Sequence, residues 1–181
     1  MIRLGSSSKT RAMILENKNI DFVQIGSDFD EEQITTKDPR EFVKEAVEGK
    51  FNDLFKKYGI DDYPLLVADT VVTSQNILLR KPKDRDDARK MLELQSGNSV
   101  SIITAMVYRS KDTYIEDISI TTYTFLPFLK EDLDHYINSG ECMGKAGAIM
   151  VEGFCKPYIK SVKGYETTAM GLCVEKLLPF L

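Results

Sequence analysis

Two long stretches in the second half of the chain constrain its fold most. Residues Val100–Tyr108 and Tyr114–Phe125 are rich in Val, Ile, Thr and Tyr, and a short polar connection around Lys111 joins them. β-branched and aromatic residues favour extended strands, and two such strands separated by a short turn pair antiparallel. The sequence therefore predicts a long antiparallel element.

The rest of the chain alternates between strands and helices. The clearest helix begins at Asp38-Pro39, where Asp caps and Pro starts the first turn, and it ends at Gly59. The apolar run Pro64–Ala68 is typical of a buried central strand. The other predicted elements are strands at Ile2–Leu4, Asp21–Ile25 and Tyr158–Val162, and helices at Lys9–Asn17, Arg85–Leu94, Glu131–Ile137 and Met170–Leu178. This order predicts a mixed α/β fold.

Length and charge limit the function classes. A chain of 181 residues predicts one domain spanning 1–181. The formal net charge of −4 gives no sign of a duplex-binding surface, so no stable nucleic-acid partner is expected. The sequence has no uncharged stretch of membrane-spanning length and no signal peptide at its start, so we expect no membrane association and a cytoplasmic location.

The histidine and cysteine content narrows the chemistry. His135 is the one histidine, which argues against Ser-His-Asp triads and multi-histidine metal sites. Metal chemistry would then rest on carboxylates and a hard ion such as Mg²⁺ or Mn²⁺. Cys142, Cys155 and Cys173 show no paired spacing, and their odd number favours reduced thiols.

A turn of small residues links the first strand to the first helix. Gly5-Ser6-Ser7-Ser8 leads into a helix that carries Lys9 and Arg11. Free N–H groups and the positive end of the helix dipole make an anion site, and the hydroxyls and cations suit a polyphosphate. The alternative interpretation is an ordinary helix start that Ser8 caps.

Asp69 and Thr70 follow directly after the apolar run Pro64–Ala68. We expect Asp69 to lie at the carboxyl edge of the sheet, where the ligand sites of α/β folds collect. A carboxylate there can hold Mg²⁺ or accept a proton from an attacking water. A turn-capping aspartate is the competing interpretation.

Other charged residues recur beside turn-forming residues. The acidic loop Asp28–Glu32 contains the clustered carboxylates that hard cations prefer, although a solvated loop has the same composition. Lys50, Lys81 and Lys145 would form a phosphate cage if the fold brings them together, and each alone fits an ordinary surface lysine. Glu152 follows an apolar stretch and is suited to accept hydrogen bonds from a nucleobase edge. The alternative there is a glycine-marked strand with a bulge.

Taken in order, these segments resemble the Maf / septum-formation-inhibitor family of nucleoside triphosphate pyrophosphatases. The resemblance covers the whole chain, and the ordered set of motifs is specific. The matching segments are Leu4–Arg11, Asp30-Glu31, Lys50-Phe51, Ala68–Val72, Arg80-Lys81-Pro82, Ser96-Gly97, Lys145-Ala146-Gly147 and Gly171-Leu172.

The resemblance implies a fold and an activity. The fold is a mixed α/β, elongated, two-lobed Maf/inosine-triphosphatase-like domain with a central mixed sheet and a cleft between the lobes, usually as a homodimer. The activity is hydrolysis of a nucleoside triphosphate to monophosphate and pyrophosphate with Mg²⁺ or Mn²⁺. Asp69 is the implied proton acceptor, and it shares the metal with Glu31. The residues implied to bind substrate are Ser6, Ser8, Arg11, Lys50, Thr70, Lys81, Lys145 and Glu152.

Three of these positions are the ones the family uses to choose the base, and they point to different substrates. Thr70 matches the branch that acts on thymidine and uridine triphosphates, whereas Glu152 matches the branch that acts on 7-methylguanosine triphosphate; Arg11 is the third position. A carboxylate accepts two N–H bonds, as a guanine edge would offer. An amide can also donate to a pyrimidine carbonyl. The preferred base therefore stays open.

Two departures from the family pattern leave room for other functions. Lys9-Thr10 replaces a Pro-Arg pair, and Arg80 replaces the glycine of a Gly-Lys-Pro motif. The alternatives are a catalytically weak, nucleotide-binding regulator of cell division and a house-cleaning enzyme for damaged purine triphosphates. Binding without turnover would favour the first, and preferred turnover of inosine triphosphate the second.

Overall fold

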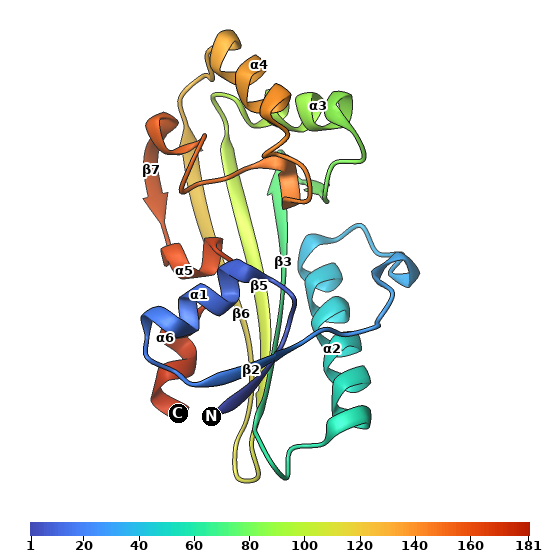
Figure 1. The fold of residues 1–181 in the computed structure, drawn as a ribbon. Helices are drawn as coiled ribbons and strands as arrows, with labels where there is room; N and C mark the ends of the chain where they lie inside the picture. The colour runs from blue at the N-terminus through green and yellow to red at the C-terminus, as the bar shows by residue number, and fades with distance from the viewer.

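The computed structural model describes residues 1–181 as an elongated molecule built on one mixed sheet (Figure 1). The sheet order is β2-β1-β3-β5-β6-β7, and β4 pairs with β3 outside this path. β1 is parallel to β2 and β3, and the other pairs are antiparallel, which confirms the predicted mixed α/β class. The strands are β1 (Ile2–Gly5), β2 (Phe22–Ile25), β3 (Leu65–Ser74), β4 (Ile77–Leu79), β5 (Ser99–Arg109), β6 (Tyr114–Phe125) and β7 (Ile159–Lys163).

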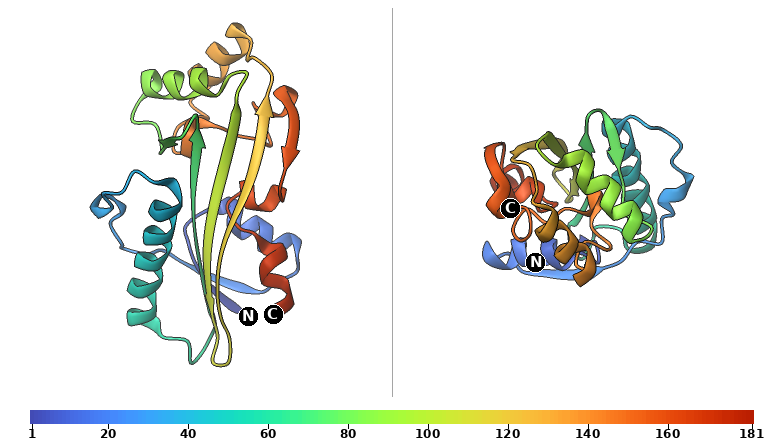
Figure 2. Two further views of the ribbon diagram at one scale, coloured as in Figure 1. Left: turned by 180° about the vertical axis from the view of Figure 1, so that it is seen from behind. Right: turned by 90° about the horizontal axis from the view of Figure 1, so that it is seen from above.

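The predicted antiparallel pair is confirmed and runs along the length of the molecule (Figures 1 and 2). β5 and β6 pair from Ser99 opposite Thr124 to Arg109 opposite Tyr114. β5 is buried over most of its length because its side chains belong to apolar clusters on both faces of the sheet, whereas many side chains of β6 are more exposed. This hairpin joins the two ends of the molecule.

β3 is longer than the sequence indicated. We expected the strand to stop at Ala68, but it continues to Ser74, so the prediction that Asp69 lies at the carboxyl edge of the sheet is wrong. The polar residues after Ala68 stay extended because β5 pairs with every residue of β3. Asp69 therefore occupies the middle of a strand.

The opposite side of β3 is only partly covered. β1 pairs with Leu65 and Leu66, and β4 pairs with Val72, Thr73 and Ser74. β1 ends at Gly5, where the chain turns into the first helix. The edge of β3 at residues 67–71 is thus left without a strand partner, and the backbone there is open to a cavity.

Helices cover both faces of the sheet and one end of it. α2 lies on one face, α1, α5 and α6 lie on the other, and α3 and α4 lie at the far end of the hairpin (Figures 1 and 2). None of them is both long and apolar enough to cross a bilayer. Their bounds are α1 (Lys9–Asn17), α2 (Pro39–Tyr58), α3 (Arg85–Gln95), α4 (Lys130–Ser139), α5 (Glu166–Ala169) and α6 (Val174–Leu177).

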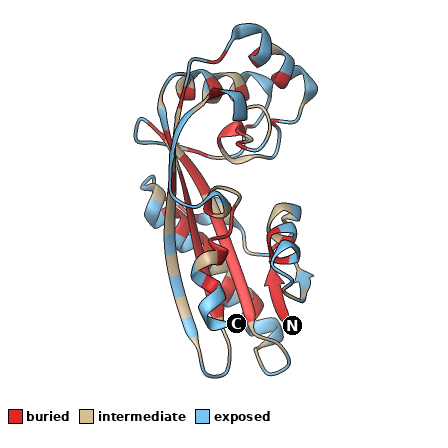
Figure 3. Cartoon of the chain, turned by 90° about the vertical axis from the view of Figure 1, so that its left-hand side faces the viewer, coloured by how far each residue is buried: buried red, intermediate tan, exposed pale blue.

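The core divides into three apolar clusters, and the buried residues follow the sheet (Figure 3). One cluster joins α2 to the odd-numbered side of β3, and a second joins α1 and α6 to the even-numbered side. The third and largest lies at the end that carries α3 and α4. Burial of these side chains supplies the main stabilising term, at about 25 cal/mol per Å² of apolar surface. The site lies where the three clusters meet.

The predicted closing helix Met170–Leu178 is confirmed only in its second half, and its predicted start is wrong. α5 ends at Ala169, and α6 begins only at Val174. Gly171 lies between them with φ +105°, a conformation that side-chain-bearing residues rarely adopt. The break turns the carbonyl of Gly171 toward Arg11, whose Nε donates a 2.7 Å hydrogen bond to it.

Candidate active site

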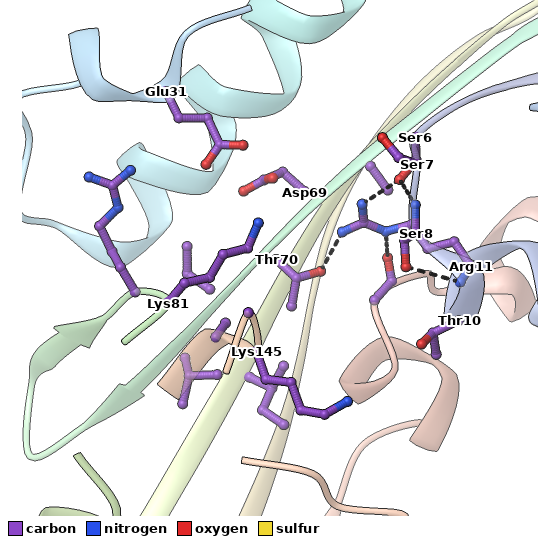
Figure 4. A pocket seen from close by; sticks show the side chains of 18 of the residues that line it. Ser6, Ser7, Ser8, Thr10, Arg11, Glu31, Asp69, Thr70, Lys81 and Lys145 are labelled. Carbon is purple, nitrogen blue, oxygen red and sulfur yellow. Dashed lines mark hydrogen bonds between the residues drawn. The ribbon is translucent and has the colours of Figure 1, made fainter. Parts of the chain in front are cut away.

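A cavity of about 1010 Å³ opens at the uncovered edge of β3. The size suits a nucleotide, since small-molecule sites range up to about 1,000 Å³. The structure brings every residue that the sequence singled out for binding, catalysis or metal to the wall of this cavity. They are Ser6, Ser8, Arg11, Glu31, Lys50, Asp69, Thr70, Lys81, Lys145 and Glu152. Figure 4 labels all of them except Lys50 and Glu152.

Asp69 and Thr70 are neighbours in β3 and face opposite sides of the sheet, because successive strand side chains alternate. Val67 and Val71 share the side of Asp69 and pack in the cluster that contains α2. Ala68 shares the side of Thr70 and packs with α1 and α6. Because the strand edge is uncovered here, one cavity reaches both sides.

On the α2 side, one ammonium group joins two carboxylates. Lys50 Nζ lies 2.5 Å from Asp69 Oδ1 and 2.5 Å from Glu31 Oε1. Lys50 projects from the fourth turn of α2, whose start is fixed by the Asp38 cap, and Glu31 opens a short 3₁₀ turn capped by Asp30. Asp69 is buried, and Glu31 is about one-third exposed. The three groups form a charged cluster, named here the Lys50 cluster.

The pKa values of the two carboxyl groups in the Lys50 cluster are shifted in opposite directions. Burial raises the pKa of Asp69 above its ordinary value, and the charges of Lys50 and Arg11 offset this only in part. Burial also acts to raise the pKa of Glu31, but the hydrogen bond and charge of Lys50 and the charges of Lys81 and Arg80 outweigh it and lower the pKa overall. Asp69 is therefore the better proton acceptor of the two.

Glu31 and Asp69 fit a hard divalent cation that is shared with a phosphorylated ligand. The structure gathers no group of three or more metal-ligating side chains. Mg²⁺, however, is commonly held by one or two carboxylates together with substrate phosphates and water. Lys50 contacts one oxygen of each carboxylate, which leaves Glu31 Oε2 and Asp69 Oδ2 outside those two contacts.

On the other side of β3, the guanidinium of Arg11 joins three segments of chain. Its Nε donates to the Gly171 carbonyl at 2.7 Å, Nη1 to Ser6 Oγ at 2.9 Å and Nη2 to Thr70 Oγ1 at 3.1 Å. Burial lowers the pKa of Arg11, and the charges of Asp69 and Glu31 oppose that shift. These bonds hold the serine turn, β3 and the segment after α5 together.

The serine turn presents hydrogen-bond donors to the cavity. Ser6 Oγ accepts from Ser8 N at 3.2 Å and from Arg11 Nη1 at 2.9 Å, so both of its lone pairs are used and its O–H remains to donate. Ser8 Oγ caps α1 by accepting from Arg11 N, as predicted. The side chain of Gln24 donates to the Ser6 and Ser8 carbonyls and fixes the turn.

The remaining predicted residues lie on the wall contributed by the third apolar cluster. Lys81 and Glu152 are exposed, and Lys145 is half-buried. The loop that carries Lys145 is anchored by Gly147, whose N–H donates to the Arg80 carbonyl and whose carbonyl accepts from Gln95 Nε2. A Cβ on Gly147 would lie 2.8 Å from Val72 Cγ1, so only glycine allows this approach.

Several contributors were missed by reading the sequence. Arg80 pairs with Glu32 through Nη2–Oε1 at 3.1 Å, and it lies over the Phe42 ring at 5.1 Å, which links the two sides of the cavity mouth. The carbonyl of Gly171 and the side chains of Gln24 and Gln95 position other site residues. Arg80 and Gly171 lie in motifs named above, but no motif reveals the contacts of these residues, because their partners are distant in sequence.

The chain is similar to known proteins over nearly its whole length. A family model described as Maf-like protein matches residues 1–181. The chain is 52% identical over 179 residues to a nucleoside triphosphate pyrophosphatase of a Nitratiruptor species, covering 98% of this chain and 96% of that protein. It is 36% identical over 178 residues to a nucleoside triphosphate pyrophosphatase of Helicobacter pylori, covering 98% and 93%. It is also 36% identical over 179 residues to a dTTP/UTP pyrophosphatase of Acholeplasma laidlawii, covering 98% and 93%. The chain belongs to the Maf family.

Proposed function

We propose that this protein hydrolyses a nucleoside triphosphate to the nucleoside monophosphate and pyrophosphate. The observation that carries the proposal is the single cavity in which Asp69, a buried carboxyl group whose pKa is raised by burial, lies among cations from four separate segments of the chain. Relatives that the chain matches over nearly its whole length are named for the same activity.

The triphosphate is held by donors and cations. The hydroxyl groups of Ser6 and Ser8 donate hydrogen bonds to the phosphates, and the N-terminus of α1 adds the positive end of its dipole. Lys81 and Lys145 neutralise charge on the phosphate oxygens. Arg11 adds positive charge next to the serine turn, where its own hydrogen bonds keep it in place. Most of the rate acceleration comes from these charges, because negative charge develops on the phosphoryl oxygens.

Asp69 activates the attacking water. Its carboxylate accepts one proton as the water oxygen bonds to the α-phosphorus, the bond from that phosphorus to the bridging oxygen breaks, and pyrophosphate leaves. Lys50 keeps Asp69 oriented and holds Glu31 beside it. Glu31 and Asp69 would hold Mg²⁺ or Mn²⁺ together with the phosphates, and such an ion supplies charge stabilisation for the phosphoryl group.

The base is recognised at Arg11, Thr70 and Glu152. Glu152 offers a carboxylate at the cavity wall, and Thr70 offers a hydroxyl that is hydrogen-bonded to Arg11. One relative is named for action on dTTP and UTP, which gives these two nucleotides first place among the candidates. The homodimer and the cytoplasmic location stay predictions from the sequence.

The test is pyrophosphate release from a panel of natural and modified nucleoside triphosphates with Mg²⁺ or Mn²⁺. We expect turnover of at least one member and a loss of about 10²–10⁴-fold in Asp69→Asn, the usual contribution of a general base. Asp112→Asn, in the exposed β5–β6 turn, is the matched control and should keep full activity. An Asp69→Asn protein with undiminished turnover would overturn the mechanism. Binding of nucleotides without turnover by the unchanged protein would favour the regulator instead.

A further inference from the structure

A chain of hydroxyl groups runs from the cavity wall into the core. Thr70 Oγ1 lies 2.9 Å from Thr104 Oγ1, and Thr104 Oγ1 lies 2.7 Å from the Thr168 carbonyl oxygen. Thr104 is on β5, directly opposite Thr70 in the sheet register. Thr104 and Thr168 are buried, with exposed fractions of 1% and 0%, whereas Thr70 lines the cavity.

The direction of this chain is fixed by its inner end. A carbonyl oxygen only accepts hydrogen bonds, so Thr104 must give its one hydroxyl proton to the Thr168 carbonyl. Thr104 then has no proton for Thr70 and can only accept from it. The reverse arrangement would place two lone pairs against each other in the core, where polar groups without a partner are strongly disfavoured.

The outer end of the chain is fixed by Arg11. A guanidinium only donates, so Thr70 Oγ1 accepts the bond from Arg11 Nη2 at 3.1 Å. Thr70 thus donates a hydrogen bond to Thr104 and accepts one from Arg11. Its second lone pair is all that remains for a ligand in the cavity.

We propose that Thr104 is a positioning residue that makes Thr70 a hydrogen-bond acceptor only, so the site selects a nucleobase that presents an N–H at Thr70. This inference rests on the proposed function, because it assigns the base edge of the nucleotide to Thr70. An acceptor at this place repels phosphate oxygens and base carbonyls alike. Ser6, which has only a proton left to offer, has the opposite polarity and suits the phosphates.

The polarity has a measurable consequence for matched pairs of substrates. UTP and CTP differ only at N3 and position 4 of the base, and ITP and ATP differ only at N1 and position 6; donor and acceptor are exchanged at both atoms. Whichever of these atoms faces Thr70, one member of a pair meets an acceptor with an N–H and the other with a lone pair. We expect the unchanged protein to favour one member of a pair in kcat/KM by about tenfold or more, the value of one well-made hydrogen bond.

Two variants of Thr104 isolate the effect. Thr104→Val keeps the shape and removes the hydroxyl, so Thr70 regains a free proton and can donate as well as accept. The Thr168 carbonyl still accepts from Gly171 N at 3.0 Å, which limits the disturbance. We expect the preference within the pair to fall to about threefold or less, while Thr104→Ser, which keeps the hydroxyl, restores it.

A double variant tests the coupling itself. In a Thr70→Val background the acceptor is already missing, so adding Thr104→Val should leave the preference unchanged, whereas two independent sites would give additive effects. Thermal melting of each variant reports folding. Calorimetric binding of the same four nucleotides reports the preference separately from turnover.

The outcomes separate the two proposals. Absence of turnover in the unchanged protein, with a polarity preference still seen in binding, would overturn the hydrolase and leave the role of Thr104 intact. A Thr104→Val protein that loses activity on both members equally and keeps the preference would overturn the role of Thr104, because that is the result of a purely structural defect. A protein that neither hydrolyses nor distinguishes the members of a pair would overturn both.

Discussion

The two sides of β3 at Asp69 and Thr70 use different physics although they are one residue apart. On the α2 side, the Lys50 cluster holds three ionisable groups within short contact. On the α1 side, the guanidinium of Arg11 and the hydroxyl groups of Ser6, Thr70 and Thr104 form a hydrogen-bond network. Each bond in this network has a fixed donor and a fixed acceptor. The α2 side places charged groups beside a buried carboxylate. The α1 side determines which atoms donate hydrogen bonds and which accept them.

The difference shows how one strand serves both chemistry and recognition. A bound polyanion and its counter-ions change the electrostatic interactions among Lys50, Glu31 and Asp69, because all three groups are charged. A hydroxyl network barely responds to distant charge, yet one wrong atom leaves a polar group without a partner. We therefore expect changes on either side to lower stability, changes on the α2 side to lower the reaction rate most, and changes on the α1 side to alter substrate choice most.

The largest expected effect is that of Lys50→Met. Removing the ammonium leaves Asp69 buried beside Glu31 without its close cation, so we expect kcat to fall by about 10²–10³-fold, as when one stabilising group of an active site is lost. The unfolding free energy should fall by about 3 kcal/mol, the usual cost of leaving a buried charge unpaired. Steady-state kinetics and denaturant titration measure both.

Lys57→Met is the matched control for Lys50→Met. Lys57 lies on the same helix and also pairs with two carboxylates, Asp28 and Asp53, but it does so at the surface and away from the cavity. Its loss should leave kcat within about twofold, since exposed ion pairs contribute little. Equal losses in the two variants would mean that the Lys50 cluster has no special place in the reaction.

The second effect is expected from Arg11→Lys. A lysine keeps the charge but cannot donate to Gly171, Ser6 and Thr70 together, because it lacks the planar fork. We expect a loss of about 2 kcal/mol in unfolding free energy, in the range for a lost hydrogen bond to a charged group. The preference between bases should weaken at the same time.

Arg3→Lys serves as the comparison for Arg11→Lys. Arg3 is also largely buried and donates to the Gly59 carbonyl at 3.1 Å, outside the cavity. The Arg3→Lys substitution should lower the unfolding free energy without changing the preference between bases. If Arg11→Lys destabilised the fold but left substrate choice as it was, the α1 side would be scaffold alone.

The third effect concerns pH. Asp69 must be ionised to accept a proton, and its pKa is raised by burial, so the acid limb of kcat/KM should lie above the ordinary aspartate pKa of about 3.9. Activity is then present above that limb and lost as pH falls through it. Glu31→Gln removes a negative charge that raises the pKa of Asp69, so the limb should move to lower pH. Thr70→Val, on the other side of the strand, should leave the limb where it is, and a limb that follows Thr70 instead would contradict the assignment of Asp69.

The smallest effect is expected from Arg80→Ala. Its ion pair with Glu32 is exposed, with the Glu32 side chain 78% accessible, so stability should change by at most about 1 kcal/mol. Because Arg80 joins the two sides of the cavity mouth, we expect a rise in KM of about two- to fivefold, as expected for about 0.4–1 kcal/mol. A large fall in kcat would mean that Arg80 belongs to the catalytic machinery.

Much of the local structure could be predicted from the amino-acid sequence. The β5–β6 pair followed from residues that favour strands, and the starts of α1 and α2 followed from Ser8 and Asp38, because strand propensity and capping depend on near neighbours. The ordered motifs also named ten residues that line one cavity. Each of these signals is carried by residues close together in the chain.

The ends of those elements and the contacts within the site depend on tertiary interactions. Asp69 lies inside β3 because β5 pairs along the whole strand. The closing helix begins only after Gly171, whose carbonyl accepts a hydrogen bond from Arg11, 160 residues earlier. The shared ammonium of Lys50 and the one-way hydroxyl chain through Thr104 likewise depend on partners from other segments. Hydrogen-bond direction and charge pairing are properties of groups in contact, and contacts between distant segments exist only once the sheet has formed.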